Sequence, residues 1–549
     1  MSKYKSSVKS SIQDFSKAVH ASVPRNTFYR PSGLKTTFNA GELVPIYIDE
    51  ILPGDTYAMK IQHVAKMLTP LTPTMDNLEL EFFAFFVPNR IVWENWQELM
   101  GENRDSAWTP AAAPHAVPYI ETDEAQVEGR IGDYYGIPKN MNYSHHPVNA
   151  LPGRGYIRIW NEWFRNQNLQ APIVIGKGDT YIGAATYSPS GTLLKVNKPH
   201  DYFTSCLPEP QRGESQMIPI SLNELIPVIT SISDSGATYN GAGLRFKDTA
   251  DANPAQNLVL QIDSSFGQLN GNSTTYAAPT EGAMYPSNLS ADPSGIDFSA
   301  TTIAELRTAF QIQKLYERDA RGGTRYVEML KAHFGVDAGD YRLQRPEYLG
   351  HTKTIIGINQ VAQTSETNTT AQGNVAAYGH SQGNDFLFNK SFVEHGFVHI
   401  FAVARQKKTY QQGLDRMWSR QDRLDYFLPV LGQISEQPVY TKELYALANN
   451  ADTVFGYNEA WSDYRYKPNK VTGQMRSSSS NTFEIWHYAD DYSSAPILGS
   501  TWMYDNSHDN VERTLAVQTV DQIKMDVRFD LEATRPIPVN SIPGMIDHF

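Results

Sequence analysis

Cysteine is nearly absent from this chain of 549 residues, which contains a single one, Cys206. A single cysteine excludes an intramolecular disulfide and a zinc site built from cysteine thiolates. Stability must therefore come from buried side chains or from association with other chains. Charge is also scarce, since charged residues make up 19% of the sequence while aromatic residues reach 11%. This balance favours a strand-and-loop protein with broad contact surfaces over a helical enzyme.

Two kinds of targeting segment are missing as well. No apolar run approaches the roughly 20 residues that a membrane-spanning helix needs, so we expect no membrane insertion. The first residues, MSKYKSSVKSSIQDF, lack the apolar segment of a secretory signal. We therefore expect a protein that is made and kept in a cytoplasm.

The net charge of −12 is unevenly placed along the chain. Residues 1–35 hold seven Lys or Arg and one Asp, so they carry +6 and the remaining residues carry −18. A basic arm suits contact with nucleic acid, because Lys and Arg attract phosphates without regard to sequence. Residues 1–24 fit such an arm, although a solvated flexible terminus explains their composition equally well. The candidate DNA contacts are Lys3, Lys5, Lys9, Lys17 and Arg25.

Many separated segments have strand patterns. Residues 523–531 alternate strictly between apolar and charged residues, which predicts a half-buried strand. Residues 78–87 and 392–404 are mostly apolar without alternation, as in strands that are buried on both faces. Further strands are expected at 44–51, 354–361 and 482–488. Because helices are confined to connections, the pattern predicts a mainly β protein, a β-sandwich or jelly roll with large insertions.

The longest helical pattern lies between residues 301 and 335. Thr302 and Glu305 form a capping-box signature, which predicts a helix start. Gly322 and Gly323 predict a break, followed by a second helix that Thr324 caps. Shorter helical segments are expected at 92–100, 156–169 and 411–425. The charged outer faces of the long pair suit solvent or a partner surface.

Residues 230–299 differ in composition from the rest, being rich in Ser, Thr, Asn, Gly, Ala and Asp with a net charge of −5. Disorder is the simpler interpretation of such a segment. We favour an ordered insertion of short strands, because Leu258–Ile262 is apolar and aromatic residues are available for packing. Long insertions between core elements are usually exposed and functional.

The sharpest enzyme-like signal is the stretch 379–383, GHSQG, which matches the G-x-S-x-G nucleophile motif around Ser381. That motif needs a strand before the serine and a helix after it. Here a polar loop at 364–383 is predicted to contain it, and a strand to follow. His395 and His399 would lie about 13 Å apart on that strand, at roughly 3.3 Å per residue, too far to share a metal ion. We expect no enzyme, cofactor or metal site, and regard these histidines and His145–His146 as structural.

Six motifs stand in one order along most of the chain. They are VPRNTFYRPSGLKTTFNAGELVPIYIDEILPGDTY (23–57), FFAFFVPNRIVWENWQELMGE (82–102), LRTAFQIQKLYERDARGGTRYVEMLKAHFGV (306–336), RPEYLG (345–350), GNVAAYG (373–379) and SFVEHGFV (391–398). Together they resemble the major capsid proteins of gokushovirus-type microviruses, which are small phages with single-stranded DNA. The resemblance thins out over residues 230–299 and much of 441–520.

The resemblance implies a viral jelly-roll core, an eight-stranded β-sandwich or barrel with long loop insertions and a few helices. It implies self-assembly into a T=1 icosahedral shell around a circular single-stranded DNA genome, with minor virion and scaffold proteins as partners. The protein would then reside in the virion, after assembly in the bacterial cytoplasm. Residues 225–300 would form a surface protrusion, at the threefold axes, that binds a host receptor.

On this basis the chain divides into four parts. They are the basic arm (1–24), the first part of the core (25–224), the surface insertion (225–300), and a final part (301–549) with the helical pair, the rest of the core and an extended tail. The helical pair offers Arg318, Arg321 and Arg325 as candidate subunit contacts. The alternative function, motivated by the aromatic residues and the jelly-roll pattern, is a carbohydrate-binding or carbohydrate-active protein.

Overall fold

The computed structural model describes residues 24–102, 115–120, 125–179, 191–214, 303–369, 371–449 and 452–540, together with short strands between 221 and 299. The chain divides into two compact units. The first combines Met1–Arg212 with Glu317–Phe549, and the second is Gly213–Tyr316.

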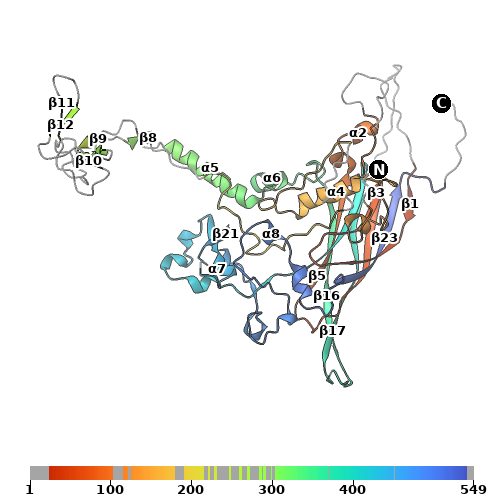
Figure 1. The fold of residues 1–549 in the computed structure, drawn as a ribbon. Helices are drawn as coiled ribbons and strands as arrows, with labels where there is room; N and C mark the ends of the chain where they lie inside the picture. The colour runs from red at the N-terminus through yellow and green to blue at the C-terminus, as the bar shows by residue number, and fades with distance from the viewer. Residues whose placement is uncertain are drawn as a thin grey trace, which may run out of the picture. The chain divides into compact units, whose positions relative to one another are not determined.

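Nine antiparallel strands form the frame of the first unit (Figure 1). Their hydrogen-bonded order is β3-β18-β5-β16-β17-β4-β23, and both β1 and β2 pair with β23. Their bounds are β1 Asn26–Tyr29, β2 Ser32–Phe38, β3 Val44–Ile51, β4 Thr56–Met67, β5 Leu78–Pro88, β16 Glu347–Ala362, β17 Val375–Ser391, β18 Gly396–Gln406 and β23 Ile523–Arg535.

Strand β16 belongs to both halves of this path. Residues 347–356 pair with β5, whereas residues 357–362 pair with β17. The sheet therefore curls at β16. As a result, strands β3, β18 and β5 face strands β17, β4 and β23. The predicted fold class, a mainly β jelly roll with few helices, is confirmed.

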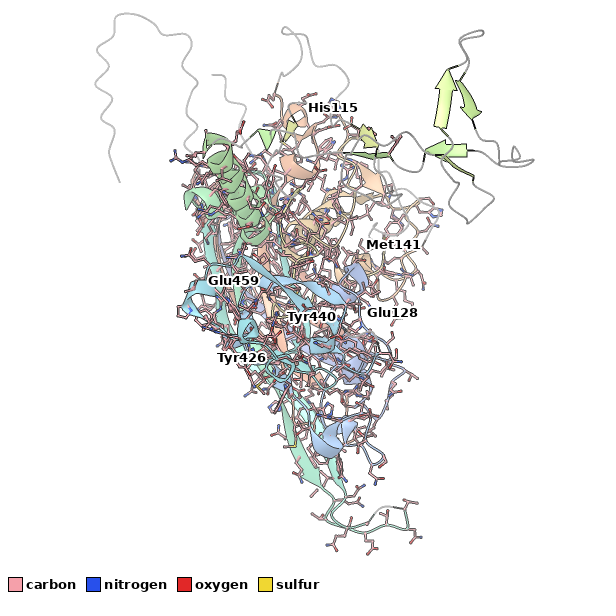
Figure 2. The ribbon with its side chains drawn as sticks, turned by 90° about the vertical axis from the view of Figure 1, so that its left-hand side faces the viewer. His115, Glu128, Met141, Tyr426, Tyr440 and Glu459 are labelled. Atoms are coloured by element: carbon pink, nitrogen blue, oxygen red, sulfur yellow. The ribbon has the colours of Figure 1, made fainter. Side chains whose placement is uncertain are left out.

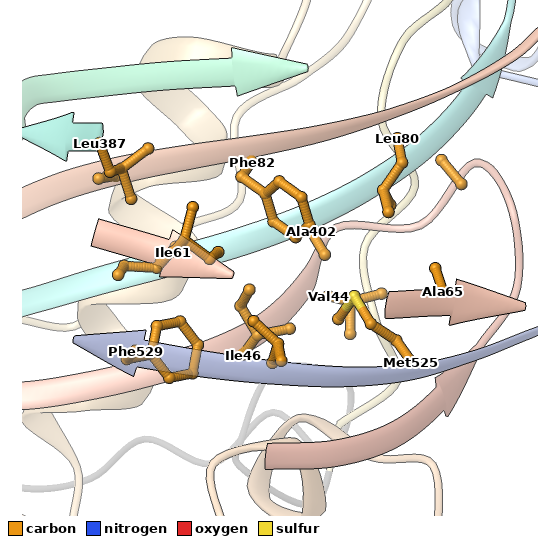
Figure 3. Packing of buried hydrophobic residues seen from close by; sticks show 14 of the residues in the cluster. Val44, Ile46, Ile61, Ala65, Leu80, Phe82, Leu387, Ala402, Met525 and Phe529 are labelled. Atoms are coloured by element: carbon orange, nitrogen blue, oxygen red, sulfur yellow. The ribbon is translucent and has the colours of Figure 1, made fainter. Parts of the chain in front are cut away.

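One apolar core fills the space between the two halves (Figure 3). Phe82 of β5 and Ala402 of β18 lie in it together with Ile61 of β4 and Phe529 of β23. The strand predicted at 523–531 shows the expected alternation, since its apolar residues are buried and its charged residues are exposed or half-buried. Burial of apolar side chains from both halves is the main force that holds the fold.

A second cluster lies on the opposite face of β5 and β18. There Phe85 and Phe401 lie in one buried cluster with Trp160. The covering elements are α1 (Asn89–Val92), α4 (Leu151–Ile159) and the π-helical turn η1 (Trp160–Phe164). Burial on both faces explains why β5 and β18 have mostly apolar sequences.

The second unit contains short antiparallel strand pairs, as predicted for the insertion. The pairs are β8 (Ser221–Leu222) with β15 (Phe298–Ser299), β9 (Val228–Thr230) with β14 (Leu289–Ala291), β10 (Phe246–Asp248) with β13 (Met284–Pro286), and β11 (Val259–Ile262) with β12 (Leu269–Asn272). The helix α5, Ile303–Gly322, begins in this unit and ends in the first. The residues from 225 to 300, predicted to form the insertion, fall within the second unit.

The remaining elements are short and lie in the connections. They are α2 (Trp96–Leu99), β6 (Tyr119–Ile120), α3 (Ile131–Tyr134), β7 (Val148–Asn149), α6 (Tyr326–Phe334), β19 (Thr409–Tyr410), β20 (Glu436–Tyr440), α7 (Thr441–Leu444), β21 (Val454–Glu459), β22 (Asn469–Lys470), α8 (Ser500–Met503) and α9 (Ser507–Glu512), with 3₁₀ turns between them. Within the described ranges, no helix has the length and apolar character needed to cross a membrane.

Several local predictions were wrong. The predicted strand at 482–488 contains a 3₁₀ turn, Glu484–Trp486, and the predicted loop at 364–383 contains much of β17. The helix expected at 156–169 begins at Leu151, because Pro152 occupies its first turn, where proline is tolerated. The helix expected at 92–100 is split into α1 and α2. The second long helix is capped by Arg325 and not by Thr324, and it ends as predicted at Gly335, whose φ of 68° is left-handed.

Candidate subunit-contact surfaces

The helical pair is tied to its own subunit by two of the three arginines predicted to contact other subunits. Arg321, in the last turn of α5, pairs with Glu436 of β20, and its Nη1 lies 3.8 Å from Oε1 of Glu459 on β21. Burial raises the pKa of the Glu436 carboxyl, and the Arg321 hydrogen bond opposes that rise. Loss of Arg321 would thus leave a buried carboxylate without this partner.

Arg325 is the second of these arginines, and its side chain is largely buried. Its guanidinium donates to the carbonyl oxygen of Arg165 over 2.8 Å and lies 3.1 Å from Glu328 Oε1. Its backbone N–H donates to Glu328 Oε2 over 3.1 Å, which satisfies a free donor at the start of α6. These contacts lie within one subunit, so a contact of Arg325 with a neighbour stays a prediction.

Arg318 differs from the other two because it lies exposed on α5. No ion pair to it occurs within the part of the chain that the structure describes. Of the three arginines it is therefore the one with a guanidinium available to a neighbouring molecule.

A larger exposed surface lies between β18 and β20, where sequence analysis predicted only a charged helical segment. Three single 3₁₀ turns stand there: η3 (Arg416–Ser419), η4 (Arg423–Asp425) and η5 (Pro429–Leu431). Seven large apolar residues of this segment, which we call the 417–434 strip, are exposed: Met417, Trp418, Leu424, Tyr426, Phe427, Val430 and Ile434. Val430 is 92% exposed and Trp418 is 69% exposed.

The polar side of the strip is anchored to the rest of the first unit. Arg420 pairs with Asp463, and its guanidinium carbon lies 4.3 Å from the ring centroid of Tyr464. The ring of Phe427 lies 5.6 Å from that of Trp461, edge to face. Figure 2 labels Tyr426 of the strip and Glu459 of the neighbouring β21. A fixed, exposed and aromatic-rich apolar surface is typical of a protein–protein contact.

Four of the predicted DNA contacts, Lys3, Lys5, Lys9 and Lys17, lie outside the described residues. The fifth, Arg25, is exposed just before β1, and its Nη2 donates to Thr56 Oγ1 over 2.7 Å. Its charge is therefore open to solvent, and the prediction of DNA contact stays untested.

Ser381 is buried in the middle of β17, where it pairs with Ala65 of β4. Its hydroxyl lies 3.0 Å from Thr354 Oγ1 and 3.3 Å from Nε2 of His63. Nδ1 of His63 has no hydrogen-bond partner in the described residues, so no carboxylate orients the imidazole by a hydrogen bond there, and Asp385 acts on it only through its charge. A nucleophile elbow requires an exposed serine on a tight turn. Ser381 is buried, and it lies in a strand.

The predicted structural histidines lie in different parts of the chain and differ in exposure. His399 is completely buried in β18, whereas His395 precedes that strand, so the prediction that both lie on the strand was wrong. His145 and His146 are exposed. Among the described residues, His508, Asp509 and Glu512 bring three possible ligand atoms within 4.8 Å of one another, but Asp509 is mostly exposed and no further donor completes a site.

The chain is similar to known proteins along nearly its whole length. Residues 16–545 match the family described as Capsid protein (F protein). Capsid protein VP1 of Bdellovibrio phage phiMH2K is 40% identical over 539 aligned positions, which cover 96% of each chain. Capsid protein VP1 of Chlamydia phage 1 is 37% identical over 593 positions, 97% of each chain. Capsid protein VP1 of Spiroplasma virus 4 is 38% identical over 565 positions, 99% of this chain and all of that protein.

The matches extend over both units of the fold, and each matched family or protein is described as a capsid protein. They agree with the jelly-roll frame, with the exposed apolar strip and with a Ser381 that is buried in a strand. The chain therefore belongs to the capsid protein (F protein) family of small phages, and it is a structural component of the virion, not an enzyme.

Proposed function

We propose that copies of this chain assemble into a closed T=1 icosahedral shell around a circular single-stranded DNA genome. The single observation that carries the proposal is the match to phage capsid proteins along nearly the whole chain. The 417–434 strip supports it, because burying such a surface against another copy removes exposed apolar area from water. A closed shell repeats each contact many times, so interfaces of modest individual strength suffice.

The genome would contact the basic arm. Five of the seven positive charges in residues 1–35 of an otherwise acidic chain come from Lys3, Lys5, Lys9, Lys17 and Arg25. Contacts between these side chains and phosphates are independent of sequence, which suits a protein that must cover a whole genome.

The insertion at 225–300 would lie on the outer surface and bind the host receptor. Its support is the separation of residues 213–316 as a compact unit of their own, whose strand pairs take no part in the jelly-roll sheet. Variation in such a unit would leave the core packing intact. Scaffold and minor virion proteins would assist assembly in the host cytoplasm. The carbohydrate-binding alternative gains no support from the relatives, all of which are capsid proteins.

The proposal can be tested with the full chain produced together with its phage genome in a host cell. Sedimentation and electron microscopy should detect uniform closed particles that contain single-stranded DNA. Nuclease treatment of intact and of disrupted particles would separate enclosed from adsorbed DNA. A chain that remains monomeric under all of these conditions would contradict the proposal.

A further inference from the structure

Charged side chains are buried together where the chain leaves β18. Nζ of Lys408 lies 2.6 Å from Oδ1 of Asp505 and 4.0 Å from Oδ1 of Asp490. Nζ of Lys198 lies 3.8 Å from Oδ2 of Asp490. The side chains of all four residues are at most 3% exposed. Solvent screens such groups poorly, so their arrangement is set by their neighbours in the protein.

A carboxamide completes this cluster. Nζ of Lys408 donates to Oδ1 of Asn506 over 2.6 Å, and Nδ2 of Asn506 donates to Oδ1 of Asp490 over 3.0 Å. Because a carboxylate only accepts hydrogen bonds, Asp490 fixes which end of the amide faces the lysine. The Lys408 amine thus lies beside the carbonyl oxygen of the Asn506 side chain, and the Asp490 carboxylate lies beside the amide nitrogen of Asn506.

The backbone holds both partners in place. Asn506 is the N-cap residue of α9, and the backbone N–H of Asp505 donates to Val196 over 2.9 Å. Lys408 stands between β18 and β19, and the backbone N–H of Asp490 donates to Thr409 over 3.0 Å. The Lys408 amine and the Asn506 amide are therefore held next to each other in one orientation. Such positioning raises the effective concentration of one group at the other.

The cluster is buried beside aromatic side chains. Nζ of Lys198 lies 4.2 Å from the ring centroid of Trp502, and the Tyr492 hydroxyl donates to Asp490 over 2.8 Å. Burial lowers the pKa of the Lys198 ammonium to about 8. A neutral amine is the nucleophilic form of lysine.

We propose that Lys408 and Asn506 become joined by an isopeptide bond between Nζ and Cγ. Asp505 accepts one proton from the Lys408 ammonium, and the neutral amine attacks Cγ of Asn506. A second Nζ proton passes by way of Asp490 to Nδ2, the Cγ–Nδ2 bond breaks, and ammonia leaves. One proton remains on Nζ in the new amide, and the first stays on Asp505 or passes to solvent. The step uses no oxidant, reductant or cofactor.

The bond would close a covalent loop from residue 408 to residue 506. That loop contains the 417–434 strip. The bond would therefore covalently link the two ends of the segment that presents the surface proposed to contact other subunits. A cross-link across so long a loop restricts the unfolded chain, as a disulfide does. A chain with only one cysteine has no intramolecular disulfide with which to achieve the same effect. The cross-link does not depend on the proposed shell.

The test is the intact mass of the full-length protein, denatured after it has folded and been incubated. We expect a mass lower than that of the sequence by one ammonia molecule, and a branched proteolytic peptide that joins the segments containing residues 408 and 506. A mass equal to that of the sequence would overturn the proposal. Loss of water instead of ammonia would also overturn it, because that outcome assigns the bond to an aspartate.

Variants locate the bond. Lys408→Arg keeps the positive charge but lacks the nucleophile, so it should restore the full sequence mass. Lys407→Arg is the matched control, because Lys407 is its exposed neighbour, and it should keep the mass deficit. Asp490→Asn preserves volume but removes the group that relays the proton to the leaving nitrogen, so the deficit should form more slowly. If any of these variants fails to fold, the peptide map of the unaltered protein still decides the question.

Discussion

A 2.9 Å hydrogen bond between the Tyr135 hydroxyl and Nδ1 of His399 joins the end of α3 to the middle of β18. His399 is completely buried, and its ring lies parallel to that of Phe401 with centroids 6.0 Å apart. Burial lowers the pKa of His399 to about 3. A buried imidazole with a pKa this low is uncharged at neutral pH.

The first prediction concerns the effect of acid. Between pH 6.5 and about 3 the unfolded chain binds a proton at His399 and the folded chain does not. Stability from this residue is therefore lost as the pH falls through that window, by up to about 1.4 kcal/mol per pH unit. His399→Gln cannot titrate and should flatten the pH dependence. Denaturant midpoints at pH 7 and pH 5 for both proteins measure the difference, and parallel profiles would contradict the assignment.

The second prediction concerns Gly155 in α4. A Cβ at this position would stand 2.8 Å from Nε2 of His399 and 3.7 Å from Val87. Gly155→Ala should therefore destabilise the fold by about 1–3 kcal/mol, because the packed β18 side chain cannot move aside freely. Gly357→Ala is the control, since the nearest atom to its Cβ would be 3.8 Å away. Equal unfolding midpoints for the two variants would show that the contact is not tight.

The strand β23 and the doubly buried β5 were predictable from sequence because their side-chain patterns report burial directly. Strand β17 was hidden by its polar composition, since GHSQG and its neighbours have few apolar residues. They form a strand because β17 pairs on one side with β16, which precedes it in the chain, and on the other with β4, which lies far away in sequence. The predicted strand at 482–488 had the right residues but no such partner in the sheet.

The candidate surfaces were predictable to different degrees. The helices that carry Arg318, Arg321 and Arg325 followed from capping signals and helical spacing. The intramolecular pairing of Arg321 with Glu436 did not, because it joins residues 115 apart. The 417–434 strip was missed because sequence periodicity shows where apolar residues occur and not whether another element covers them.

The third prediction concerns the 417–434 strip. Val430→Asp places a charge on a side chain that is 92% exposed in the single subunit. Folding stability should change by only about 0.5 kcal/mol, whereas burial of the unpaired charge in a contact should reduce particle yield about tenfold or more. Val174→Asp is the control, because Val174 is 90% exposed but outside the strip. Thermal melting and sedimentation of both variants give the two measurements. A normal particle yield from Val430→Asp would contradict the proposal that the strip forms a contact between subunits.

The fourth prediction concerns the basic arm. Deleting residues 2–20 removes Lys3, Lys5, Lys9 and Lys17 while leaving the jelly-roll frame intact. Particles should still form but contain several-fold less DNA, because the lost contacts are with phosphates. The ratio of DNA to protein in nuclease-treated particles measures this. Lys35→Gln, which removes an exposed charge on β2, should leave the ratio unchanged. Unaltered DNA content in the deletion particles would exclude the arm as a genome contact.

The fifth prediction concerns the insertion. Residues 225–300 lie within a compact unit whose strands pair only with one another, so their replacement should not disturb the nine-stranded sheet. Exchanging them for the matching segment of a related phage should keep particle yield and melting temperature but change which hosts are infected. The control exchanges β20 and β21 (436–459), which pair with each other in the first unit and contact Arg321 of α5. That exchange should lower particle stability without altering host choice. An insertion exchange that leaves host range unchanged while adsorption to cells remains normal would contradict a role in attachment.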